Sequence, residues 1–126
     1  MLDNPNSQTE RFIIEQIDSV PHLEGLLLLW NARPQSRSVH DMAKALYVPV
    51  DVAERVLSDL SARDLIVRVP DPPDSYCYNS NSERDTLLRE VDSTYRTQLI
   101  RISGLIHSKA SVAVRDFARA FRFKKD

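Results

Sequence analysis

The amino-acid sequence predicts a mainly helical fold that carries a small two-stranded β-sheet. Two short apolar patterns of helical period lie between residues 38 and 62, and two strand-like runs follow them directly. A longer helical pattern then covers residues 82–107. With 126 residues, the chain is long enough to bury a core without disulfides, so we expect one compact domain.

The first part of the chain predicts two helices. The first is expected over about Thr9–Ser19, with Thr9 as its cap and an apolar side formed by Phe12, Ile13, Ile14 and Ile17. The second follows with Ser19 as cap and Pro21 in its first turn, and runs to about Arg33. Residues 23–30 are apolar on nearly every side of this second helix, so we expect it to be central and covered from more than one direction.

Residues 38–79 predict two further helices and a hairpin. Ser38 is a favourable cap for the first helix, whose inward residues are Val39, Met42, Ala43 and Leu46. Pro49 opens the next helix, whose inward residues are expected to be Val52, Ala53, Val56, Leu57 and Leu60. Leu65–Val69 is rich in β-branched residues and predicts a strand, with Tyr76–Asn79 as its antiparallel partner across a proline-rich loop.

The second half predicts a long helix over residues 82–107 and a short terminal helix over residues 111–121. One apolar stripe follows the long helix at spacings of three and four: Leu88, Val91, Tyr95, Leu99, Ile102 and Ile106. A helix of about 26 residues is roughly 39 Å long, more than a small domain needs, so we expect the stripe to form a homodimer interface. Packing against the central helix of the same chain is the alternative. In either case, we expect residues 1–80 to hold the N-terminal helices and the helix–helix–hairpin unit. Residues 81–126 are expected to form the C-terminal helical packing or dimerisation region.

The segment from Ser38 to Asn79 resembles the winged helix-turn-helix of bacterial MarR-like transcriptional regulators. The resemblance covers about a third of the chain, with apolar and strand residues at the expected positions: Met42, Ala43, Leu46, Val48, Val56, Leu60, Leu65, Val67 and Arg68. The sequence departs from the pattern where Tyr47 and Asp64 replace two customary glycines, although aspartate tolerates the left-handed conformation better than most residues. The resemblance implies a homodimeric transcriptional regulator that places its second helix in the major groove of duplex DNA.

Several basic residues are candidates for contacts with DNA. Arg55 lies on the predicted outer face of the second helix and is the candidate for reading bases. Phosphates would be contacted by Arg33, Arg37, Lys44, Arg63 and Arg68, and by the backbone N–H groups of the helix that begins at Ser38.

The sign of the charge disagrees with this expectation. The same outer face carries Asp51, Glu54 and Asp59, and the predicted hairpin loop carries Asp71 and Asp74. These carboxylates repel phosphates, and strong DNA binders neutralise several phosphates at once. The alternative is therefore a protein-interaction module without DNA binding, which uses this acidic face or the basic C-terminal tail, whose cations include Arg119, Arg122, Lys124 and Lys125. Both hypotheses stay open.

Other classes of function find no support in the sequence. No nucleophile or phosphate-loop motif is present, and the three histidines show no metal-ligand spacing, so we expect neither an enzyme nor a metal or other cofactor. Cys77 has no basic neighbour and is expected to be inert. The longest apolar run, Leu26–Trp30, is too short to cross a bilayer, and the N-terminus does not resemble a signal peptide. We therefore expect a cytoplasmic protein.

Overall fold

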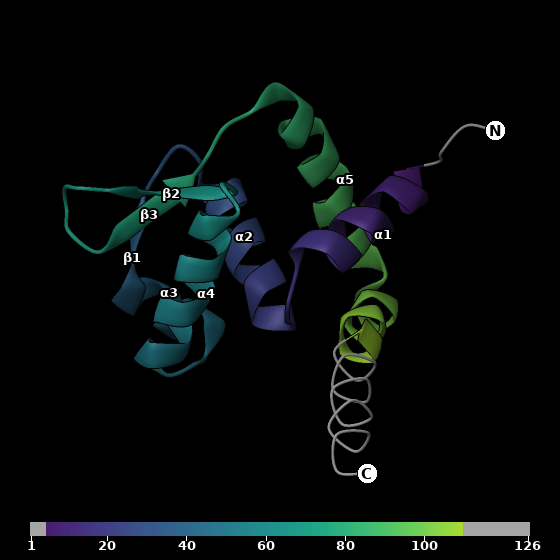
Figure 1. Ribbon diagram of the computed structural model, residues 1–126, viewed down its shortest axis with the longest axis horizontal. Coiled ribbons are helices and arrows are strands. Elements are labelled where there is room, and N and C mark those ends of the chain that lie inside the picture. Colours follow the sequence, from purple (N-terminus) through teal and green to yellow (C-terminus); the bar gives the residue numbers. More distant parts are fainter. Residues whose placement is uncertain (1–4, 110–126) are drawn as a thin grey trace, which may run out of the picture.

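The computed structural model describes residues 5–109, with side chains from residue 8 onward. The fold is mainly helical and includes a three-stranded antiparallel sheet (Figure 1). Its elements in chain order are α1 (Pro5–Gln16), α2 (Val20–Ala32), β1 (Arg37–Ser38), α3 (Val39–Leu46), α4 (Val50–Ala62), β2 (Ile66–Val69), β3 (Ser75–Tyr78) and α5 (Ser82–Thr97). A further helical segment covers residues 99–109. The predicted helix over residues 111–121 and the basic tail lie outside the described residues.

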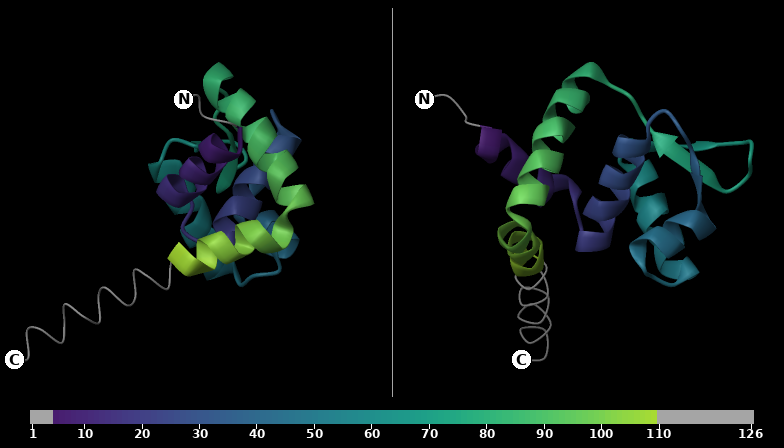
Figure 2. Two further views of the ribbon diagram at one scale, coloured as in Figure 1. Left: turned by 90° about the vertical axis from the view of Figure 1, so that its right-hand side faces the viewer. Right: turned by 180° about the vertical axis from the view of Figure 1, so that it is seen from behind.

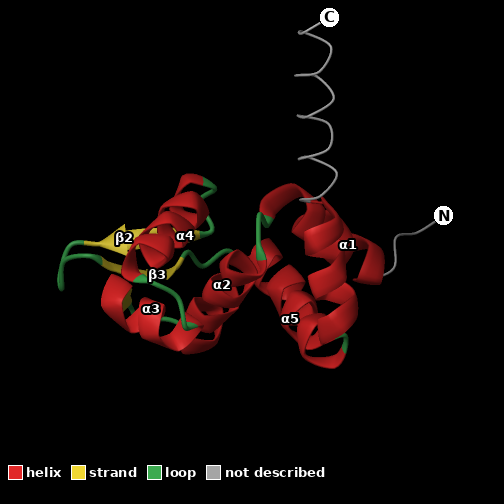
Figure 3. Cartoon of the chain, turned by 90° about the horizontal axis from the view of Figure 1, so that it is seen from below, coloured by secondary structure: helices red, strands yellow, loops and turns green. Residues whose placement is uncertain are grey.

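The central helix of the molecule is α2, as its apolar surface predicted. The helices α3 and α4 lie with the sheet on one side of it, and α1 and α5 lie on the other side (Figures 1 and 3). Gly25 allows α2 to approach its neighbours closely, since a Cβ atom there would lie 3.3 Å from Val56 Cγ1 and 3.6 Å from Leu46 Cδ1. The core of the helix–sheet side therefore forms directly against α2.

The two N-terminal helices follow the prediction in part. Ser19 caps α2, because its side chain accepts a hydrogen bond from the backbone N–H of His22, and a proline occupies the first turn. The prediction for α1 was wrong at both ends, because the helix begins at Pro5 and ends at Gln16. Thr9 consequently lies inside α1, where its side chain is fully buried, and does not act as a cap.

A tight turn joins α3 to α4. Ser38 caps α3 as predicted, with Oγ accepting from the backbone N–H of Asp41 at 3.1 Å. Tyr47 ends α3 in the left-handed conformation with φ of 57°, and the N–H of Val48 donates to the carbonyl of Ala43 at 3.1 Å. Asp64 adopts the left-handed conformation with φ of 61° after α4, as expected for aspartate at this position.

The predicted hairpin is present and belongs to a larger sheet. Strand β2 pairs with β3 in antiparallel register, with Ile66 opposite Tyr78 and Val69 opposite Ser75. The two-residue strand β1 pairs with the other edge of β3, which gives the order β1-β3-β2. The sequence did not predict β1, because two residues are too few to show the alternation that marks a strand.

The predicted long helix is interrupted. It ends at Gln98, whose φ of −131° and ψ of 45° are not helical, and a second helical segment starts at Leu99 and changes direction (Figure 2). The hydroxyl of Thr97 bonds back to the carbonyls of Ser93 and Thr94, a competition with the helix backbone that weakens helices. Gly104 lies within the second segment and does not interrupt it.

Most of the long apolar stripe is buried within the single chain. The side chains of Leu88, Val91 and Ile102 have no exposed surface, and Ile106 is 1% exposed. These four residues join the core of the chain. The helix α5 packs mainly against α1 and to a smaller extent against the central helix α2, so the stripe packs within one chain, but its main partner is not the helix that the alternative named. The four buried residues therefore offer no contact area to a second copy, whereas Leu99 is 50% exposed and Tyr95 half-buried. No helix in the described part of the chain is long and apolar enough to cross a membrane.

Candidate functional site

The outer face of α4 is open to solvent. Its inward residues are Ala53, Val56, Leu57 and Leu60, which are buried as predicted. The prediction for Val52 was wrong, because it is 37% exposed. At 3.6 residues per turn, Val52 lies about a quarter turn from the centre of the buried stripe and so reaches only its edge. The solvent-facing surface therefore combines Asp51, Val52, Glu54, Arg55 and Ser58.

Three of the candidate DNA contacts are exposed and unpaired. The side chains of Arg37, Lys44 and Arg55 form no hydrogen bond or ion pair with any residue that the structure describes. They come from three successive elements, β1, α3 and α4. Their charges are available to a ligand without the loss of an internal contact.

The other candidate contacts are already engaged within the chain. The Arg33 guanidinium lies over the Trp30 ring, 4.0 Å from its centroid, and Arg68 forms an ion pair of 2.8 Å with Asp74 in the hairpin. Arg63 donates to both Asp18 oxygens and, at 3.0 Å, to the carbonyl of Glu15. The hydroxyl of Ser38 serves as the cap of α3. The number of free cations is therefore smaller than the sequence suggested.

The acidic outer face of α4 is smaller than predicted, because Asp59 does not belong to it. Asp51 and Glu54 are exposed, but the carboxylate of Asp59 is turned toward α2, where Oδ2 lies 2.8 Å from His22 Nε2. Two exposed apolar side chains lie at the start of α4, where Tyr47 is 95% exposed and Val50 is 38% exposed. The surface around the start of α4 is thus partly acidic and partly apolar, with Lys44 and Arg55 among its exposed cations.

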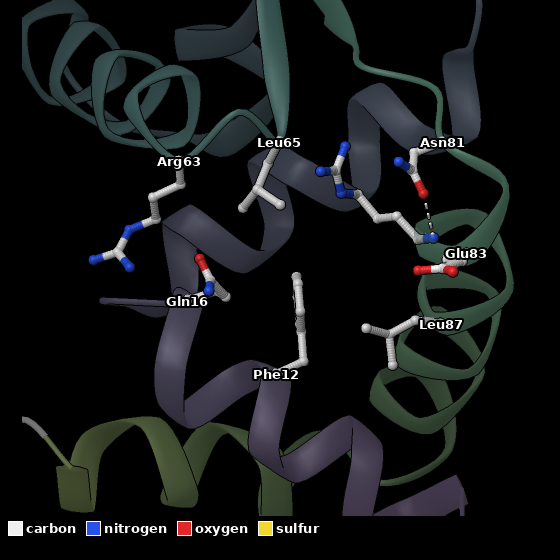
Figure 4. Close-up of a pocket in the computed structure, with 8 residues that line it drawn as sticks. Phe12, Gln16, Arg63, Leu65, Asn81, Glu83 and Leu87 are labelled. Carbon is white, nitrogen blue, oxygen red and sulfur yellow. Dashed lines mark hydrogen bonds between the residues drawn. The ribbon is translucent and has the colours of Figure 1, made fainter.

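Several hollows lie between the described elements. One of about 350 Å³ is lined by side chains of α1, the end of α4 and the start of α5 (Figure 4): Phe12, Gln16, Arg63, Leu65, Asn81, Glu83, Arg84 and Leu87. Both arginines in it are held by main-chain carbonyls, Arg63 by Glu15 and Arg84 by Asn79. The rim of the hollow therefore carries two anchored arginines together with Glu83, and Arg63 is also paired with Asp18.

The second hollow, of about 330 Å³, lies between α2, α3 and α5 and includes Tyr47 and Tyr95. The hydroxyl of Tyr95 donates to Glu24 at 2.9 Å. Burial of the phenol, together with this hydrogen bond, raises the pKa of Tyr95 to about 12. Trp30 of α2, by contrast, is buried in the core.

A third group of residues was missed in the sequence. Asp18, His22 and Asp59 come together where the α1–α2 turn meets the end of α4. The separation of 37 residues between His22 and Asp59 gives no local signal. The only signal in the sequence is the spacing of four residues between Asp18 and His22, which is common by chance.

Comparisons with known proteins bear on the fold alone. No protein-family model matches the sequence, and no curated protein is similar to it. Among solved structures, the chain is similar to the one described as the crystal structure of RV1404 from Mycobacterium tuberculosis, with a TM-score of 0.52 and 23% sequence identity. The match covers 89% of this chain and 81% of the other. The likeness thus extends over most of the chain and concerns its fold alone.

Proposed function

We propose that this chain is a winged helix-turn-helix protein that binds duplex DNA as a homodimer and regulates transcription in the cytoplasm. In this proposal α3 and α4 form the helix-turn-helix, and the β2–β3 hairpin forms the wing. The observation that carries it is the open outer face of α4, on which Arg55 is exposed and unpaired within the described residues. A helix that presents such a face beside a hairpin has the geometry that places side chains against base edges in the major groove.

The free cations define the proposed contacts. Arg55 would contact a base edge, while Lys44 and Arg37 would contact phosphates on either side of it. Arg33, Arg63 and Arg68 would make weaker contributions, because binding must compete with their contacts inside the chain. With few phosphates neutralised, we expect modest affinity that falls with added salt.

The proposed dimer uses exposed apolar residues, since most residues of the apolar stripe on residues 88–106 are buried within the chain. Ile14 in α1 is 46% exposed, and Leu99 and Ile100 are 50% and 86% exposed. Side chains of this kind gain the most from burial against a second copy.

The test is the binding of a labelled mixed-sequence DNA duplex at low salt, measured by fluorescence anisotropy. We expect the double variant Lys44→Ala with Arg55→Ala to bind at least tenfold more weakly and to reduce the salt dependence by about one phosphate contact. The matched control, Arg89→Ala with Arg96→Ala, removes two exposed cations of α5 and should change binding little. Absence of binding, or equal losses in both double variants, contradicts the proposal.

One observation favours a second candidate, a module that binds another protein without DNA. The start of α4 displays Tyr47, Val50 and Val52 beside Asp51 and Glu54, which suits a partner with apolar and basic groups. Recovery of a partner from cell extract that survives nuclease treatment supports this candidate. Loss of the partner on Asp51→Asn with Glu54→Gln assigns it to α4. Loss on neutralising Arg119, Arg122, Lys124 and Lys125 assigns it to the tail.

A further inference from the structure

Three side chains with metal-binding atoms meet where the α1–α2 turn lies against α4. Asp18 precedes α2, His22 lies in the first turn of α2, and Asp59 lies in the last turn of α4. One ligand atom from each lies within 4.8 Å of the other two. We propose that Asp18, His22 and Asp59 form a binding site for a divalent transition-metal ion of the Zn²⁺ class. This inference does not depend on DNA binding.

The imidazole of His22 is already held in the orientation that a metal requires. The residue is 7% exposed, and its Nδ1 lies 2.6 Å from the hydroxyl of Ser19. Its Nε2 points toward the carboxylates and lies 2.8 Å from Asp59 Oδ2. Histidines that bind metals through one ring nitrogen are commonly fixed by a hydrogen bond at the other nitrogen, which is the role available to Ser19.

The spacing of the ligand atoms fits a small ion. Zinc–nitrogen and zinc–oxygen bonds of about 2.1 Å in tetrahedral geometry place the ligand atoms about 3.4 Å apart. The atoms here are separated by between 2.8 and 4.8 Å, which brackets that value. Binding of the ion requires the two carboxylates to move slightly. They have room to do so because the side chain of Asp18 is 43% exposed and that of Asp59 is 41% exposed.

The ligand set selects the class of ion. One imidazole with two carboxylates suits Zn²⁺, Co²⁺ or Ni²⁺, whereas Mg²⁺ and Ca²⁺ prefer ligands that are all oxygen. Water would complete the coordination on the solvent side, where both carboxylates are accessible. An ion held there would join α4 to α2 by bonds and would fix the position of α4 against the centre of the molecule.

Two groups compete with this ion: the hydrogen shared between His22 Nε2 and Asp59 Oδ2, which must be released on binding, and Arg63. Its guanidinium donates to the two oxygens of Asp18 at 3.2 and 3.4 Å, so the ion must displace it. Arg63 has a second anchor, since another of its N–H groups donates to the Glu15 carbonyl. Lys109 lies close by, but its ammonium donates to the carbonyls of Ile13 and Ile17. Removal of the Arg63 charge should therefore tighten metal binding. If the three residues had only a structural role, loss of Arg63 would not favour binding of an ion.

The experiment titrates the tag-free, chelator-treated full chain with Co²⁺ and follows the visible d–d absorption, with Zn²⁺ as competitor. We expect one site per chain, with binding at least tenfold weaker in Asp59→Asn and in His22→Gln. Arg63→Gln should bind severalfold more tightly. His40→Gln, which removes an exposed histidine elsewhere, is the matched control and should bind as the original chain does.

Thermal melting distinguishes variants that lose metal binding from variants that fail to fold. Zn²⁺ should raise the Tm of the original chain and of His40→Gln, and should leave that of Asp59→Asn unchanged. Asp59 is partly exposed, so its amide variant should remain folded. The proposal is overturned if Co²⁺ does not bind at millimolar concentration or if Asp59→Asn binds normally. It is also overturned if His40→Gln abolishes binding, or if Arg63→Gln fails to tighten it. None of these measurements involves DNA, so their failure is separate from failure of the proposed function.

Discussion

Arg68 and Asp74 form an ion pair across the β2–β3 hairpin, with Arg68 Nη2 donating to Asp74 Oδ1 at 2.8 Å. Both side chains are largely exposed, so the pair contributes little to folding stability. Its consequence is electrostatic, because it neutralises the one arginine in the hairpin strands. In the proposed function this is the position from which a wing contacts DNA.

The first prediction is that Asp74→Asn strengthens DNA binding at low salt. The change releases Arg68 and removes one repulsive charge, so we expect an increase of about two- to fivefold with a steeper salt dependence. Asparagine also accepts the left-handed conformation of this residue, whose φ is 60°. Anisotropy titrations at two salt concentrations measure both quantities. Asp71→Asn removes the same charge without releasing Arg68, so an equal gain in that variant would assign the effect to net charge alone.

The second prediction concerns alkaline stability. The pKa of Tyr95 is raised from 10.0 to about 12, so the folded state favours the protonated phenol. Its stabilising contribution is therefore complete below pH 10 and is lost as the pH rises toward 12. Tyr95→Phe should cost about 1 kcal/mol at pH 7, because the hydrogen bond to Glu24 is removed.

Urea unfolding of the original chain and of Tyr95→Phe across this range of pH gives the measurement. The stabilisation by Tyr95 relative to phenylalanine should be constant well below pH 10 and should decline as the pH rises from 10 toward 12. A difference that stays constant to the upper limit would show that folding does not raise the pKa of Tyr95.

Local signals predicted the parts of the fold that depend on neighbouring residues. Ser19 and Ser38 cap their helices as expected, since a cap needs only the next few residues. The left-handed Asp64 also follows from local chemistry. By contrast, strand β1 exists only because β3 pairs with it, and the paired residues of β3 are 37 and 39 residues away. A pattern of two residues cannot reveal such a partner.

The candidate site was predictable to a similar degree. Helical period placed Arg55 on the outside, and the structure agrees. The period could not show that Arg63 is bound by Asp18 or that Asp59 turns toward His22, because these contacts join elements 45 and 37 residues apart. It also could not separate a dimer stripe from a buried one, since both require the same spacing. Burial of Ile102 and exposure of Ile100 depend on the bend at Gln98.

The third prediction distinguishes apolar residues of the core from apolar residues of the proposed dimer interface. Ile102 has no exposed surface, so Ile102→Ala should destabilise the fold by about 2–4 kcal/mol in urea unfolding. Ile100 is 86% exposed, so Ile100→Asp should change stability by no more than about 0.5 kcal/mol. If the proposed dimer uses this surface, sedimentation analysis should show Ile100→Asp shifted toward monomer. A dimer unchanged by Ile100→Asp would place the interface elsewhere.

The fourth prediction is that Tyr47→Gly stabilises the fold. Tyr47 holds a φ of 57°, which costs a residue with a Cβ atom about 1–2 kcal/mol and costs glycine little. Its ring is 95% exposed, so removal of the ring loses almost no packing. After the greater chain entropy of glycine in the unfolded state is subtracted, we expect a gain of about 0.5–1 kcal/mol in urea unfolding. Tyr47→Ala keeps the Cβ atom and should give no gain, so equal stabilisation by both variants would refute the strain argument. An exposed aromatic residue at a strained position is retained at a cost to stability, which is reasonable if its ring contacts a ligand. Both variants should then weaken binding of DNA or of the protein partner to the same extent, whatever their effects on stability.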